Sequence, residues 1–193
     1  MADNLTVIQT LKQKFTQSDL KKSPVVLPFK NIILWRHAQA VDVFDNEEAI
    51  YDDSGRPLTI KGQYQAKKMA SWLREHLPLD TNLQCSPALR AFQTAEALKY
   101  KIHVNNALKP SASISQVLLA VSNLTLQNNL LLVGHQPWIG QLAGYLLDTN
   151  SQRSSAIMGT EIDIKKGAIW WLRQIESVPG RYQIITVQTP SKL

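Results

Sequence analysis

The chain has 193 residues, which is enough for one domain with a substantial core, and its 44% hydrophobic and 19% charged content is that of an ordinary globular protein. No apolar run approaches the length that crosses a bilayer, and the single cysteine, Cys85, excludes both an internal disulfide and a cysteine-based metal cluster. The formal net charge is +6, but the lysines and arginines stand singly or in pairs without a dense basic block, which argues against nucleic acid as a partner.

Composition and charge also give expectations about the cellular compartment and the partner. The N-terminus lacks a basic start followed by an apolar signal core, and the low cysteine content suits a reducing environment, so we expect a cytoplasmic protein with no membrane partner. A modest positive field would steer either an anionic substrate or an acidic protein, and charge alone does not decide between them. The sequence leaves the oligomeric state open.

Residues 1–29 are predicted to form a helical extension, and residues 30–193 the main domain. Apolar residues recur at helical spacing between Leu5 and Phe15, with Lys and Gln between them. A Lys-Lys-Ser-Pro stretch at 21–24 should end this helix. We expect the helix to pack on the domain, and a partner-binding arm is the alternative.

The first buried strand is expected at residues 32–35, which read Ile-Ile-Leu-Trp. A short apolar run rich in β-branched residues, with polar flanks, is typical of strands in α/β sheets. Arg36 and His37 follow it directly, and a polar, acidic loop is expected over residues 41–56.

The later elements alternate between helices and strands. In chain order they are a helix capped by Thr59 and ended by Pro78, a strand at 83–85, a helix with Ser86 as N-cap and Pro87 as its first residue, a weak strand at 101–104, a helix at 113–121, a strand at 130–133, a helix after Pro137, and two antiparallel strands at 168–172 and 182–187. This order predicts an α/β fold, a three-layer α/β/α sandwich with a mostly parallel central sheet and a late antiparallel hairpin.

Polar residues follow the strands at three places, as Arg36 with His37, Arg90 and His135. Parallel strands present their carboxyl ends to one crevice, so these side chains are expected to converge. Two guanidiniums and two imidazoles around one point suit a phosphoryl group, because the planar fork of arginine matches phosphate oxygens.

Each of these residues also has an unremarkable interpretation when taken alone. An isolated Arg-His pair is usually a loop histidine beside an arginine in a surface ion pair. His135 could merely cap a loop, and Arg90 could pair with Glu96 or with the acidic loop.

Four sequence blocks carry a family resemblance. They are Arg36-His37 with Ala38 in the usual glycine position, the Leu-Thr-x-x-Gly-x-x-Gln-Ala block from Leu58 to Ala66, the Ser-x-x-x-Arg-Ala-x-Gln-Thr-Ala block from Ser86 to Ala95, and Gly134-His135. In this order, over roughly residues 32–145, they resemble the histidine phosphatase superfamily, the phosphoglycerate-mutase-like proteins. Three shorter stretches, 56–59, 134–137 and 166–168, are most similar to the signal-inhibitory phosphohistidine phosphatases.

The resemblance implies a phosphatase that works through a covalent intermediate. His37 would be the nucleophile that takes the phosphoryl group, and water would then hydrolyse the phosphohistidine. Arg36, Arg90 and His135 would bind the phosphate oxygens and stabilise the transition state. No metal and no cofactor is implied, and the substrate would be a phosphorylated protein or a small phosphorylated molecule.

One departure from the family pattern bears on the substrate. Larger members place an acid after the third block, where it protonates the leaving oxygen. Between Ala95 and His135 this chain has only one acid, Glu96, which is poorly placed within a helix. Lys109 lies where an acid is expected. An imidazole leaving group needs such a donor far less than an alcohol does.

We therefore expect phosphohistidine in a protein to be the better substrate. A small-molecule phosphomonoesterase, with the acidic loop supplying the proton, is the first alternative. An inactive phosphate-binding module is the second.

Overall fold

The computed structural model describes residue 16 and residues 25–42, 44–45, 48–49, 52–124, 128–148 and 161–193. The helix expected near the N-terminus lies outside these residues. Val25, Leu27 and Phe29 are buried in the same hydrophobic cluster as the helix after Pro137, so the segment just before residue 30 contributes to the core. Among the helices in these described ranges, none is long and apolar enough to cross a membrane.

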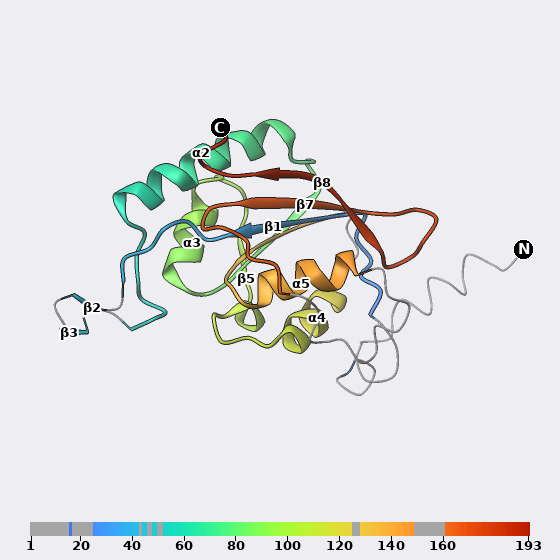
Figure 1. Cartoon of the computed structure of the whole chain (residues 1–193), viewed down its shortest axis with the longest axis horizontal. Helices are drawn as coiled ribbons and strands as arrows, with labels where there is room; N and C mark the ends of the chain where they lie inside the picture. Colours follow the sequence, from blue (N-terminus) through green and yellow to red (C-terminus); the bar gives the residue numbers. More distant parts are fainter. Residues whose placement is uncertain are drawn as a thin grey trace, which may run out of the picture.

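The centre of the molecule is a six-stranded sheet in the order β5-β4-β6-β1-β7-β8 (Figure 1). Its strands are β1 (Asn31–Arg36), β4 (Thr81–Cys85), β5 (His103–Val104), β6 (Asn129–Gly134), β7 (Ile169–Gln174) and β8 (Tyr182–Gln188). β1, β6, β4 and β5 pair in parallel, whereas β7 is antiparallel to both β1 and β8. The expected mostly parallel sheet with a late antiparallel hairpin is confirmed.

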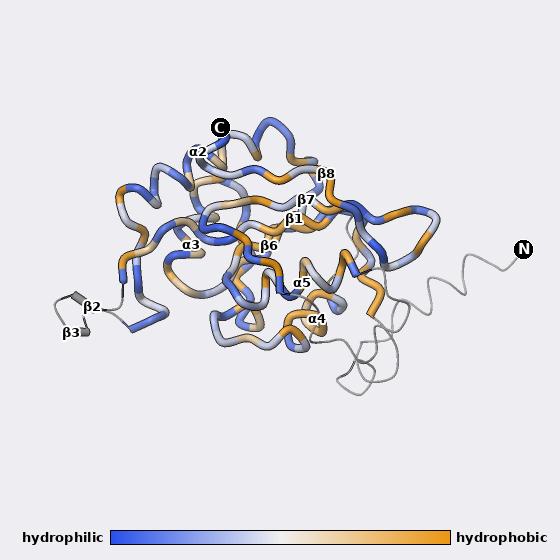
Figure 2. The backbone as a smooth tube through the Cα atoms, viewed as in Figure 1, coloured by the Kyte–Doolittle hydropathy of each residue, from blue (hydrophilic) through white to orange (hydrophobic). Residues whose placement is uncertain are grey.

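Helices cover both faces of this sheet (Figure 1). They are α2 (Ile60–His76), α3 (Leu89–Glu96), α4 (Ile114–Ser122) and α5 (Trp138–Leu147). Successive side chains of a strand point to opposite faces, and accordingly Ile32 and Leu34 pack in the cluster of α4 and α5, while Ile33 and Trp35 pack in that of α2 and α3. Figure 2 shows hydrophobic residues along the central strands and α5. The three-layer prediction is therefore confirmed.

The predicted start of α2 is correct. The Thr59 hydroxyl accepts a hydrogen bond from Gly62 N at 2.9 Å, which satisfies one of the free amides of the first turn. Gly62 is packed so closely that a Cβ there would lie 1.9 Å from the backbone oxygen of Gln39. Only glycine lets the helix approach the segment that follows β1.

The predicted start of α3 is wrong by two residues. The N-cap is Ala88 and the helix begins at Leu89, whereas we expected Ser86 as N-cap and Pro87 as the first helical residue. Ser86 instead continues from the carboxyl end of β4, because its N–H donates to Val133 O of the neighbouring β6 at 3.0 Å. Its hydroxyl does accept a hydrogen bond from Ala88 N, at 3.2 Å, but before the helix starts.

The remaining differences are small. The helix expected at 113–121 is α4, whose N-cap Ser113 forms a capping box with Gln116. Within the loop expected at 41–56, β2 (Phe44–Asp45) and β3 (Glu48–Ala49) pair as a separate two-stranded sheet. A 3₁₀-helix, η2 (Asn106–Leu108), follows β5.

Candidate active site

His37 is held by its backbone immediately after β1. Its N–H donates to Gly134 O at 2.9 Å, and the following Ala38 N–H donates to the hydroxyl of Thr94 at 3.0 Å. The ring Nδ1 lies 2.7 Å from Ala38 O, so the hydrogen-bond network places the ring proton on Nδ1. Nε2 then carries a lone pair, and it makes no hydrogen bond to any described residue.

His135 lies beside His37 because β1 and β6 are parallel neighbours, with Arg36 paired to Gly134. The two imidazole centroids are 4.9 Å apart and the rings are tilted by 50°. Nε2 of His135 lies 2.7 Å from the hydroxyl of Ser86, whereas its buried Nδ1 has no hydrogen-bond partner.

Arg36 is half-buried at the end of β1. Its Nη1 donates to Ile164 O at 2.5 Å and lies 3.5 Å from the carboxylate of Asp163. Its Nε is buried without a partner. The loop before β7 therefore orients this guanidinium, and Lys166 in the same loop lies close enough to His37 for its charge to act on the ring.

Arg90 is buried, with 3% of its side chain exposed, in the first turn of α3. Its Nη2 lies 2.9 Å from the carboxylate of Asp53, and its Nη1 donates to the backbone oxygen of the same residue. Its Nε is buried without a partner. The ion pair with the acidic loop, which the sequence left open as an interpretation, is thus present, and the pairing with Glu96 is not.

The structure brings the four predicted residues together. Buried polar atoms nearly always have hydrogen-bond partners, yet three of the four that lack one in the described part of the chain belong to this group: Nε of Arg36, Nε of Arg90 and Nδ1 of His135. The charges of both guanidiniums act on both imidazoles. Each arginine Nε carries a hydrogen, so an oxyanion that reached it would accept a hydrogen bond there.

Burial sets the protonation of the two imidazoles. It lowers the pKa of His37 to about 3, against the hydrogen bond to Ala38 O and with the help of the positive charges of Arg90 and Arg36. It lowers the pKa of His135 to about 2, with further contributions from His37 and Arg90. Both rings are therefore neutral near pH 7, and a neutral ring has the lone pair that a nucleophile needs.

Three residues at the site were not singled out as site residues from the sequence. Asp53 was only one of several acids in the loop, Ser86 was interpreted as a helix cap, and Asp163 was not considered. The prediction was based on residues that directly follow a strand, so it could not identify residues such as Asp53 and Asp163, which loops place against the arginines. Ser86, directly after β4, is the one that this signal could have found.

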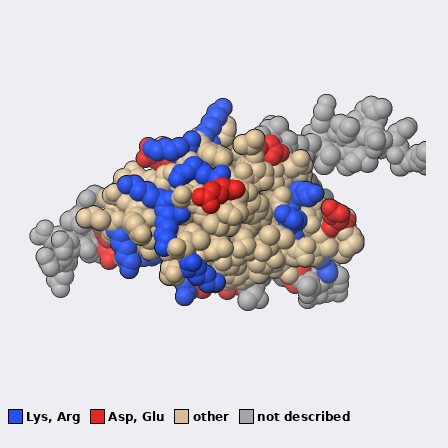
Figure 3. All heavy atoms as spheres, turned by 90° about the horizontal axis from the view of Figure 1, so that it is seen from above, with Lys and Arg blue, Asp and Glu red and all other residues tan. Residues whose placement is uncertain are grey.

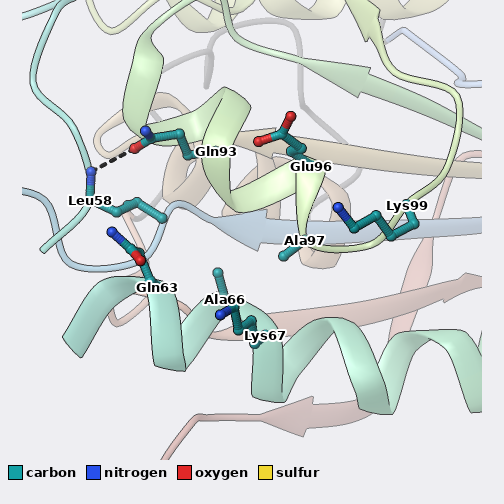
Figure 4. A pocket seen from close by; sticks show the side chains of 8 residues that line it. All are labelled: Leu58, Gln63, Ala66, Lys67, Gln93, Glu96, Ala97 and Lys99. Atoms are coloured by element: carbon teal, nitrogen blue, oxygen red, sulfur yellow. Dashed lines mark hydrogen bonds between the residues drawn. The ribbon is translucent and has the colours of Figure 1, made fainter. Parts of the chain in front are cut away.

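Glu96, the acid considered from the sequence, lines a separate pocket (Figure 4). This cavity of about 330 Å³ lies between α2 and α3 and is lined by Leu58, Gln63, Ala66, Lys67, Gln93, Glu96, Ala97 and Lys99. None of the four predicted site residues lines it. Within the described ranges, no three His, Cys, Asp or Glu side chains are grouped so that they could hold a metal ion.

Comparisons with known proteins show the family of this chain. The sequence profile of the histidine phosphatase superfamily (branch 1) matches residues 32–112. An uncharacterized protein of Picosynechococcus sp. is 31% identical over 149 residues, which cover 74% of this chain and 84% of the relative.

Solved structures are similar over most of the chain. The protein histidine phosphatase SixA complexed with tungstate is 25% identical, with a TM-score of 0.64, and the match covers 84% of this chain and 98% of that one. A putative phosphohistidine phosphatase SixA from Nakamurella multipartitia has the same fold, at 24% identity and a TM-score of 0.65 over 83% of this chain and 96% of its own. With its four sequence blocks and its fold, the chain belongs to the histidine phosphatase superfamily.

Proposed function

We propose that this protein is a phosphatase that forms a covalent phosphohistidine on His37 and that it preferentially dephosphorylates phosphohistidine in proteins. The observation that carries the proposal is the state of His37: a buried, neutral ring whose Nδ1–H is tied to Ala38 O, beside two arginines. This arrangement leaves Nε2 as the nucleophilic atom.

The proposed reaction has two steps. The ring of the substrate phosphohistidine takes up a proton from solvent, and Nε2 of His37 attacks phosphorus. The bond to His37 forms as the bond to the leaving nitrogen breaks, and a neutral imidazole departs. Arg36, Arg90 and His135 donate hydrogen bonds to the phosphoryl oxygens, whose charge they stabilise in the transition state. In the second step water attacks phosphorus, the bond to His37 breaks, inorganic phosphate leaves and the neutral ring is restored.

The acids near the site support an imidazole leaving group. Asp53 and Asp163 both lie against arginines. Burial alone would raise the pKa of Asp53, but hydrogen bonds from Arg90 and Arg56 outweigh it and lower the pKa below its usual value. Asp53 is thus ionised near pH 7 and holds no proton for a leaving oxygen. An imidazole, which takes up a proton near pH 6.5, is released more readily than an alkoxide.

Two further observations support a protein substrate. The similar SixA structure at 25% identity is that of a protein histidine phosphatase. In addition, Lys and Arg are prominent on the face of the molecule that carries α2, as Figure 3 shows, and the chain has a net charge of +6. Such a surface is compatible with an acidic phosphoprotein, and it would steer a small anionic substrate as well.

The test compares substrates and traps the intermediate. A protein phosphorylated on histidine with radiolabelled phosphoramidate is mixed with the enzyme and quenched in alkali, which preserves phosphohistidine. We expect label on the wild-type enzyme and none on His37→Ala, while the control His76→Ala, a change at an exposed histidine stacked on Trp72, keeps it. Equal kcat/KM for an alkyl phosphate would contradict the substrate preference, and phosphate binding without turnover would indicate an inactive binding module.

One observation favours the second candidate, a small-molecule phosphomonoesterase. The carboxylate of Asp53 sits on Arg90, where a phosphate oxygen would bind. A phosphoryl group that displaced it would release Asp53 from one of its two arginines, raise its pKa and let it protonate a leaving oxygen. Under this hypothesis Asp53→Asn lowers kcat for alkyl phosphates but not for phosphohistidine. Efficient alkyl phosphate turnover that depends on Asp53 would favour this candidate over ours.

A further inference from the structure

Ser86 is a fully buried hydroxyl that joins the end of β4 to the ring of His135. Its side chain has 0% exposure, and its N–H donates to Val133 O at the end of β6. Its Oγ lies 2.7 Å from Nε2 of His135 and 3.2 Å from Ala88 N, whose N–H it accepts. Oγ makes no hydrogen bond to any other atom of the described residues.

These contacts determine the direction of the Ser86–His135 hydrogen bond. A serine hydroxyl has one hydrogen to donate and two lone pairs. If Nε2 carried the ring proton, Oγ would accept from both His135 and Ala88, and its own buried hydrogen would have no acceptor, which is unfavourable. If Oγ donates to Nε2 instead, the hydroxyl hydrogen and Nε2 both have partners, and the ring proton lies on Nδ1.

The Nδ1 atom is also the one that has no partner in the protein. With its proton, it is a free hydrogen-bond donor, as a phosphoryl oxygen requires, on a ring whose centroid lies 4.9 Å from that of His37 and on which the charges of both arginines act. Without it, a lone pair would face the oxygen and repel it. The two tautomers of one neutral ring thus have opposite effects on the same ligand.

We propose that Ser86 is a positioning residue whose hydroxyl donates to Nε2 of His135 and holds this ring in the Nδ1–H tautomer that donates to the phosphoryl group. The inference rests on the proposed phosphatase activity and adds a residue whose part in it is indirect. Ser86 touches His135 and not the substrate.

A purely structural role of Ser86 would not involve the tautomer of His135. Through the bond from Ala88, Ser86 also shapes the turn before α3, which carries Arg90. If that were its only role, the loss of the hydroxyl would act independently of His135.

A double-mutant cycle separates the two roles. We expect Ser86→Ala to lower kcat by about 10–100-fold, the range found when the hydrogen-bond partner of a metal-ligating histidine is removed. Ser86→Thr, which keeps the hydroxyl, should retain most of the wild-type kcat. In a His135→Ala background, Ser86→Ala should cause no further loss. A loss of the same size in both backgrounds would overturn the proposal.

Nitrogen-15 NMR of the imidazoles tests the tautomer without any turnover. In the wild type we expect neutral Nδ1–H signals for His135, and in Ser86→Ala a shift toward the Nε2–H form. His37 is an internal control, because its Nδ1–H is held by Ala38 O and should not change. A wild-type His135 protonated on Nε2 would overturn the proposal even if the variant failed to fold. A wild-type enzyme without phosphatase activity would refute the proposed function, and the NMR result would still decide the role of Ser86.

Discussion

The carboxylate of Asp53 lies 2.9 Å from Nη2 of Arg90, and the backbone oxygen of Asp53 accepts a hydrogen bond from the same guanidinium. A second arginine, Arg56, holds the same carboxylate at 2.7 Å. The resting site therefore has an internal anion on one of the two arginines that we propose to bind phosphate. In the proposed reaction, an incoming phosphoryl group would exchange with this anion instead of meeting a bare cation.

Removing this competitor should strengthen phosphate binding. We expect Asp53→Asn to lower the inhibition constant of inorganic phosphate by about 3–10-fold, the equivalent of a partly exposed ion pair of about 0.7–1.4 kcal/mol. The matched control is Asp52→Asn, at an exposed neighbour whose side chain accepts only from Gly55 N and whose amide can still do so. An unchanged or higher constant in Asp53→Asn would show that the carboxylate does not compete.

The geometry of Arg90 should matter as much as its charge. Arg90→Lys keeps a cation but loses the planar fork, and we expect kcat/KM to fall about 100-fold, or about 2.7 kcal/mol. The control is Arg74→Lys, an exposed residue whose Nη1 donates to Ala97 O at 3.0 Å, which should leave kcat/KM unchanged. If both variants behave alike, Arg90 does not orient the phosphoryl group.

We expect kcat/KM to show no change near pH 6.5, where an ordinary histidine titrates. Burial lowers the pKa of His37 to about 3, so its ring is already deprotonated at pH 5 and above. We expect kcat/KM, after correction for ionisation of the substrate, to stay flat between pH 5 and 8. Stopped-flow assays over this range provide the test, and an acid limb with a midpoint near 6.5 would contradict it.

Stability should fall on acidification for the same reason. The unfolded chain protonates its histidines near pH 6.5, whereas His37 and His135, with pKa values lowered to about 3 and about 2, stay neutral when folded. Below pH 6.5 the unfolded state binds more protons, so each ring reduces the free energy of unfolding by about 1.4 kcal/mol per pH unit, and above pH 6.5 this contribution is complete.

Urea unfolding at pH 7 and pH 5 measures this effect. His37→Asn should lose less stability than the wild type between the two values, by about 2 kcal/mol. His76→Asn, at the exposed histidine, is the control. Equal losses in all three proteins would mean that the buried ring does not stay neutral.

The close packing of Gly62 gives a stability prediction. Alanine is normally better than glycine inside a helix, by about 1 kcal/mol. At this position the added Cβ meets the Gln39 backbone, so we expect Gly62→Ala to be destabilising by about 2–4 kcal/mol and to lower kcat by shifting the segment after His37. Gln63→Ala, at the exposed next residue, should be neutral. A stabilised Gly62→Ala would contradict the packing.

Much of the fold could be predicted because its signals are local. The apolar run of β1 and the cap at Thr59 depend on the residues themselves, and both lie where expected. The clustering of Arg36, Arg90 and His135 follows from a general property of parallel sheets, so it needed no knowledge of distant contacts.

What could not be predicted depends on contacts between distant segments. Ser86 and Pro87 form a good helix start locally, but the bonds of Ser86 to Val133 and His135 keep it at the sheet and delay the helix until Leu89. Likewise, the ion pair of Asp163 with Arg36 joins residues 127 positions apart, and no local pattern encodes such a pairing.

The place of β1 in the sheet has a consequence for how the enzyme loses activity. β1 has a hydrogen-bonded neighbour on each side, β6 and β7, and its residues are buried up to Trp35. An interior strand comes free only when the sheet as a whole opens, whereas β5 and β8 at its margins can fray alone. His37, which follows β1, therefore keeps its position when the marginal strands fray, and we expect heat inactivation to coincide with cooperative melting of the protein instead of preceding it.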